Sequence, residues 1–250
     1  MHRLLNGVTT LAFLGAPALA AAQHEHHPAT TDERVEADAN AAMAAPGVDM
    51  GKHMRLTVER TGTAADSARA RALVDTLRKA IAKYRDVTVA EADGYRQFAP
   101  KLKMPRVYHF TRKAAAIKAQ FTFDPTMPTS LLYTKGADGR FTLVGAMYTA
   151  PNRLSEEELD ARVPLSIARW HQHVNVCIPK FRERERWTEK AADGRMKFGP
   201  AGAIATEAEC KAANGRWRDR VLNWMVHANV FASDDPAVIW GDHQGKRHEH

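Results

Sequence analysis

Two segments of the chain carry histidines at a spacing that could build a metal site. Residues 168–177 include His171 and His173, and residues 222–231 include His227. Both segments are rich in valine and tryptophan, which favour β-strands, and alternate side chains of a strand point to the same face. His171 and His173 therefore share one face. A histidine pair on one strand and a third histidine on a neighbouring strand could together hold one metal ion.

His109 is the candidate for a fourth ligand. It lies between Tyr108 and Phe110 in another apolar segment, where an imidazole needs a polar partner. Buried histidines with few carboxylates nearby are expected to be neutral, and neutral imidazole suits copper, zinc, nickel and iron. We favour copper because methionine and histidine recur in the terminal segments; zinc and iron are the alternatives. A structural network of polar side chains is the metal-free interpretation.

Other polar residues could support such a site. Asn175 and Asn229 each follow a candidate ligand by two residues, so they could orient the imidazoles, or they could be ordinary amides at strand ends. Tyr148 could reach the site as a hydrogen-bond donor, although such tyrosines more often belong to the core. His53, which lies close to two methionines, is a further but weaker ligand candidate.

The chain has only two cysteines, Cys177 and Cys210. In an oxidising compartment such a pair usually forms a disulfide, which here would close a loop of about 34 residues. Cys177 would also share a strand face with His171 and His173, so a metal thiolate is the alternative. We favour the disulfide, because the start of the chain indicates export.

The N-terminal segment has the features of a secretory signal peptide. Arg3 precedes an apolar run over residues 11–20, and the run ends in small residues that suit signal peptidase, which places the signal peptide at residues 1–22. The apolar run is too short to span a membrane, and no later segment reaches that length. The expected location is the periplasm or the exterior, without membrane insertion after cleavage.

The rest of the chain is expected to form a single domain over residues 51–242. Residues 23–50, which contain several histidines, have the composition of a disordered linker. Residues 243–250 have the composition of a flexible, histidine-rich tail.

The spacing of apolar residues predicts a helix over residues 66–86, capped by Asp66 or Ser67, and a hairpin over residues 130–149. Further strands are expected near residue 108 and at the two histidine segments. Ser155 with Glu158, and Thr206 with Glu209, have the spacing of capping boxes and predict the starts of two short helices. Because the strands follow one another without regular intervening helices, the expected fold class is α+β, with a mostly antiparallel sheet and short flanking helices.

The charge of the chain gives little indication of a partner. A formal net charge of +7 on 250 residues is a mild bias. The densest basic run, residues 180–187, alternates in sign and lacks the aromatic interleaving typical of nucleic-acid binding, so we expect no nucleic-acid partner. The motifs of serine hydrolases, P-loop proteins and dinucleotide-binding folds are absent from the sequence.

Five motifs resemble those of a family of exported bacterial proteins of unknown function. They are MGKHM at residues 50–54, YHFT at 108–111, LVGAMY at 143–148, PLSIARWHQHVN at 164–175 and WMVH at 224–227. The resemblance covers roughly residues 50–240. It implies export but no established activity, so it assigns no catalytic residue.

The sequence therefore predicts an exported protein with a mononuclear transition-metal site that could serve a metal-dependent enzyme. A non-enzymatic carrier of periplasmic copper or zinc is the first alternative, and a metal-free binding module is the second. Coordination separates an enzyme from a carrier. Three histidines with an open position permit catalysis, whereas a closed site suits binding.

Overall fold

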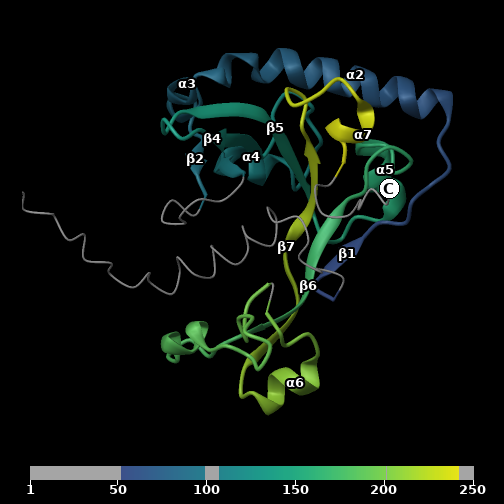
Figure 1. Cartoon of the computed structure of the whole chain (residues 1–250). Coiled ribbons are helices and arrows are strands. Elements are labelled where there is room, and N and C mark those ends of the chain that lie inside the picture. Colours follow the sequence, from purple (N-terminus) through teal and green to yellow (C-terminus); the bar gives the residue numbers. More distant parts are fainter. Residues whose placement is uncertain (1–51, 99–106, 201, 242–250) are drawn as a thin grey trace, which may run out of the picture.

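The fold is built on one antiparallel sheet of seven strands (Figure 1). The computed structural model describes residues 52–98, 107–200 and 202–241. The strand order is β1-β6-β7-β5-β4-β3-β2, and every neighbouring pair is antiparallel. The strands are β1 Met54–Leu56, β2 Arg96–Gln97, β3 Tyr108–Thr111, β4 Ser130–Lys135, β5 Phe141–Ala150, β6 His171–Ile178 and β7 Arg216–Ala228. The predicted α+β class with an antiparallel sheet is confirmed.

The predicted signal peptide, linker and tail, at residues 1–22, 23–50 and 243–250, lie outside the described residues. Among the described helices, none is both long and apolar enough to cross a lipid bilayer.

The longest helix is α2, Ala64–Ile81, which begins two residues earlier than predicted. Its N-cap is Thr63, whose side chain accepts a hydrogen bond from the Asp66 backbone, while the Asp66 carboxylate accepts one from the Thr63 backbone. Asp66 is therefore the third helical residue of a capping box, and the expectation that it caps the helix is wrong. The last predicted turn forms a 3₁₀ helix, η1 Ala82–Arg85.

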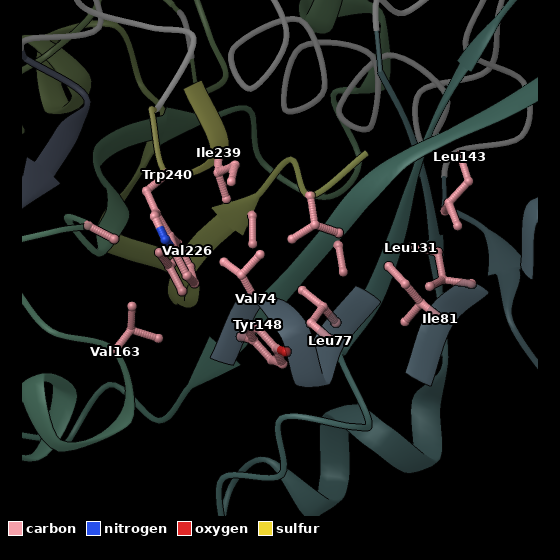
Figure 2. Close-up of a cluster of buried hydrophobic side chains, with 14 of the residues drawn as sticks. Val74, Leu77, Ile81, Leu131, Leu143, Tyr148, Val163, Val226, Ile239 and Trp240 are labelled. Atoms are coloured by element: carbon pink, nitrogen blue, oxygen red, sulfur yellow. The ribbon is translucent and has the colours of Figure 1, made fainter. Parts of the chain in front are cut away.

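The main apolar core lies between α2 and one face of the sheet, which we call the core face (Figure 2). Leu77 and Ile81 of the helix are fully buried. They belong to one cluster with Leu131 of β4, Tyr148 of β5 and Val226 of β7. Tyr148 and Val226 are direct cross-strand partners, so both point to this face. The other face of the sheet carries a different set of side chains, described below.

Short helices connect the strands. They are α3 Val87–Ala92, α4 Lys113–Lys118, α5 Glu156–Arg162, the 3₁₀ helix η2 Arg184–Thr188, α6 Glu207–Ala212 and α7 Pro236–Ile239. Ser155 and Thr206 cap α5 and α6 with the capping boxes that their sequences predict. The predicted hairpin is also present as β4 and β5, and the turn between them uses Gly139 at a φ of +80°.

The far ends of β6 and β7, with residues 179–215 between them, project from the sheet as an arm (Figure 1). Cys177 and Cys210 form a disulfide there, with their Cα atoms 5.5 Å apart, as predicted. Trp187, Phe198 and Ile204 pack around it in a small separate cluster. The disulfide closes the arm where there is too little apolar surface for a large core, and it is consistent with an oxidising compartment.

Candidate metal centre

Four histidines from three strands form a continuous cluster. The ring centroids of His109 on β3 and His227 on β7 are 5.7 Å apart. The His227 and His171 rings are 5.2 Å apart, and the His171 and His173 rings on β6 are 5.8 Å apart. The structure therefore brings together all four predicted ligands, including His109, whose strand is separated from β7 by two others.

The register of the sheet explains how these side chains meet. Met147 on β5 is the direct partner of His227, and Met225 on β7 is the direct partner of His171. Direct partners in an antiparallel pair point to the same face. Strands β3 and β7 are about 14 Å apart at the usual strand spacing, so His109 and His227 must lean toward each other across β4 and β5.

We call this second surface the histidine face. By register and alternation it contains His109, Leu132, Met147, His171, His173, Met225 and His227. Leu132, Met147 and Met225 form a small cluster separate from the main core. The sequence alone assigned no role to Met147 or Met225. Only the pairing of strands shows that methionines lie opposite the histidines.

The cluster is buried. His171 and His173 have no exposed surface, His109 is 3% exposed, and His227 is half-buried. Burial, and to a smaller extent the neighbouring His227 and His171, lower the pKa of His109 to about 3, with a small opposing effect of the Val107 backbone. His109 is therefore a neutral imidazole at any physiological pH.

His109 has little polar contact apart from the Val107 backbone. Neither of its ring nitrogens makes a hydrogen bond of normal geometry within the described residues. A buried polar group without a partner costs free energy, typically about 1 to 3 kcal/mol. Such a group in a native protein needs an explanation, and a ligand that accepts its lone pair is one.

The spacing of the rings fits shared coordination. Two imidazoles that bind one tetrahedral ion through nitrogens about 2 Å from it have ring centroids about 5 Å apart. Within the described residues, no group of three or more His, Cys, Asp or Glu side chains is arranged so that it could hold a metal ion. Shared coordination of an ion by these rings would therefore require them to rotate about their side-chain bonds until their nitrogens converge.

Asn175 and His53 make hydrogen bonds at the edge of the sheet, outside the histidine cluster. The two ring nitrogens of His53 lie 2.9 Å from the Asn175 carbonyl oxygen and 2.8 Å from the Gly202 carbonyl oxygen. The Asn175 side chain donates a hydrogen bond of 2.7 Å to the Lys52 carbonyl, and Asn175 has a φ of +57°. Both residues tie β1 and the arm to β6. The structure does not support Asn175 orienting the imidazoles or His53 acting as a ligand.

Tyr148 points away from the histidines. Tyr148 is the direct cross-strand partner of Val226 and lies on the core face. Its neighbour in the chain, Met147, lies on the histidine face. Its hydroxyl donates a hydrogen bond of 2.7 Å to the Pro125 carbonyl, and its ring packs edge-on against Phe123. Burial raises the pKa of this hydroxyl above its usual value. Tyr148 is therefore a core residue that cannot reach the imidazoles, because adjacent residues of a strand face opposite ways.

Asn229 is buried just beyond the end of β7. It is 2% exposed and lies two residues after His227 in the chain, and its predicted role in orienting an imidazole stays a prediction. Its backbone N–H donates to the Ile239 carbonyl at 2.8 Å, and its side-chain amide nitrogen has no hydrogen-bond partner within the described residues. Gly145 lets β5 approach the backbone of Ala228 closely, because a Cβ at position 145 would overlap the Ala228 carbonyl oxygen.

The disulfide removes Cys177 from the candidate ligands, since its sulfur is bonded to Cys210. The donors offered by the histidine face are therefore imidazole nitrogens and thioether sulfurs.

Comparison with known proteins does not add to this description. No protein-family model, curated protein or solved structure matches the chain. The resemblance of its five motifs to exported bacterial proteins stays a prediction from sequence.

Proposed function

We propose that this protein binds a transition-metal ion through His109, His171 and His227, with His173 as the fourth ligand or nearest neighbour. The observation that carries the proposal is the continuous cluster of four imidazoles, each 5.2–5.8 Å from the next, on one buried face of the sheet. Histidines brought together from three strands are costly to bury unless they share a task.

The protonation state of the cluster supports metal binding. A metal ion competes with protons for imidazole nitrogens, so a ligand that is already neutral binds the ion without releasing a proton. His109, with its pKa lowered to about 3, meets that condition. A structural polar network is the weaker alternative, because His109 makes no normal hydrogen bond within the described residues.

The burial of the cluster favours binding over catalysis. A catalytic metal ion needs an open coordination position for water or substrate. His171 and His173 are fully buried and His109 nearly so, which indicates a closed site. His227 is half-buried, and it marks the side from which an ion could enter. We therefore favour sequestration or delivery of a metal ion over a metal-dependent enzyme.

The test is metal analysis of the purified full-length protein. We expect one ion per chain that resists dialysis, and we expect the variants His171→Ala and His227→Ala to lose it. His53→Gln is the matched control: it removes a buried histidine outside the cluster, so it should lower stability but leave the metal content unchanged. If both cluster variants keep the wild-type metal content, the proposal is wrong.

A further inference from the structure

Methionines lie opposite three of the four clustered histidines. Met147 on β5 pairs directly with His227, Met225 on β7 pairs with His171, and Met54 on β1 pairs with His173. Direct partners in an antiparallel ladder have Cβ atoms about 4.5–5.5 Å apart. Each of these thioethers therefore starts from a position next to an imidazole.

These methionines do not belong to the ordinary core. Buried methionines usually fill gaps between apolar side chains. Here the main core under α2 contains no methionine among its described members. Met225 and Met147 are 3% and 7% exposed and pack together on the histidine face, and Met54 is half-buried at its β1 edge. Met54, Met147 and Met225 therefore all lie on the face of the sheet that carries the imidazoles.

The donor set that results is soft and uncharged. Thioether sulfur binds Cu(I) much better than it binds harder ions, and imidazole accepts copper as well as zinc. None of the residues assigned to the histidine face is Asp or Glu. Neutral donors leave the charge of the ion uncompensated, and burying one positive charge costs less than burying two. Both considerations favour Cu(I) over Zn(II).

We propose that the ion is Cu(I), and that Met147 and Met225 supply thioether donors beside His227 and His171. This proposal rests on the proposed function, since it assumes that the histidine cluster binds a metal ion. Met54, opposite His173 at the sheet edge, is the outermost methionine of this series.

The experiment is an anaerobic competition titration of the full-length protein with Cu(I) and a chromophoric Cu(I) chelator, followed by a parallel titration with Zn(II). Met147→Leu and Met225→Leu keep the apolar volume and remove the sulfur, so the fold should survive. We expect each to weaken Cu(I) binding at least tenfold and to leave Zn(II) affinity unchanged. Met196→Leu, in the arm, is the matched control and should change neither affinity.

X-ray absorption of the Cu(I)-loaded protein gives a second measurement that does not depend on affinity. We expect sulfur neighbours around copper in the wild type, and fewer of them in Met147→Leu and Met225→Leu. Unchanged Cu(I) affinity together with a copper shell of nitrogen only would overturn the thioether proposal. If the histidine variants still lost their bound metal while the methionine variants behaved like the wild type, the thioether proposal would fail and the proposed function would stand. The two proposals can therefore fail separately.

Discussion

The two faces of the sheet bury different chemistry. The core face packs leucine, valine and aromatic rings under α2, and three of its tyrosines, Tyr95, Tyr133 and Tyr148, each donate a hydrogen bond to a backbone carbonyl. The histidine face buries imidazoles and thioethers, and the ring nitrogens of His109 there make no hydrogen bond of normal geometry within the described residues. The indole nitrogens of Trp170 and Trp224 are exceptions in the core cluster.

We expect this difference to separate the residues that stabilise the fold from those of the proposed metal site. Apolar burial contributes about 25 cal/mol for each Å² removed from water, so the core face supplies much of the stability of the fold. A buried imidazole that makes no hydrogen bond of normal geometry, such as that of His109, is expected to reduce stability. The predictions that follow test whether substitutions on one face change stability alone and substitutions on the other change binding alone.

The largest stability effect is expected on the core face. Leu77 is fully buried under the sheet, so Leu77→Ala should lower the free energy of unfolding by about 2 to 5 kcal/mol. Denaturation of the metal-free protein by urea measures it. Val58→Ala, at a side chain that is 65% exposed, is the control and should change stability little. A Leu77→Ala protein that stays folded should bind metal as tightly as the wild type.

The next effect is stabilisation by metal. An ion present at 100 times its dissociation constant should raise the free energy of unfolding by about 2.7 kcal/mol, because it binds only the folded state. His109→Leu should abolish this increase while leaving the metal-free protein at least as stable as the wild type, since a poorly partnered imidazole is replaced by an apolar side chain. Thermal unfolding with and without metal measures both. A large loss of stability in metal-free His109→Leu would instead indicate a structural polar network.

The third effect is on the pH dependence of stability. The pKa of His109 is about 3 in the folded protein and has a usual value of 6.5. Between these values the unfolded chain binds a proton that the folded chain does not. Above about pH 6.5, His109 is neutral in both states and does not affect the free energy of unfolding. As the pH is lowered from there toward 3, protonation of His109 in the unfolded chain lowers the free energy of unfolding by up to about 1.4 kcal/mol for each pH unit.

Urea denaturation between pH 7 and pH 4, with a chelator present, measures this slope. His109→Leu should flatten it, whereas Leu77→Ala should lower the whole curve and keep the slope. Equal slopes in the wild type and His109→Leu would contradict the assignment of a buried neutral imidazole.

The smallest effect concerns the helix that covers the core face. Thr63→Ala removes the N-cap of α2 and should lower the free energy of unfolding by about 1 kcal/mol without changing metal affinity. Thr61→Ala removes a nearby exposed threonine outside the helix and is the matched control. Equal stability of the two variants would show that the capping box contributes nothing measurable.

Local patterns in the sequence predicted much of the fold. The capping boxes at Ser155 and Thr206 identified two helix starts, because their hydrogen bonds span only three residues. The hairpin followed from a glycine-containing turn between two apolar segments. The boundaries of α2 and β7 were less accurate. β7 begins at Arg216, earlier than predicted, since it continues along β6 into the arm, and that pairing is not local.

Sequence alone was enough to predict that His171 and His173 share a face, because side chains repeat every two residues along a strand. It favoured a disulfide between the only two cysteines, and the structure confirmed that bond. Tertiary structure decided the rest. Strand order brought His109 to His227, and the register set methionines opposite histidines while turning Tyr148 to the core. The alternation of side chains shows which residues of one strand point the same way. Only the pairing of that strand with distant segments decides which residues of other strands lie on the same face.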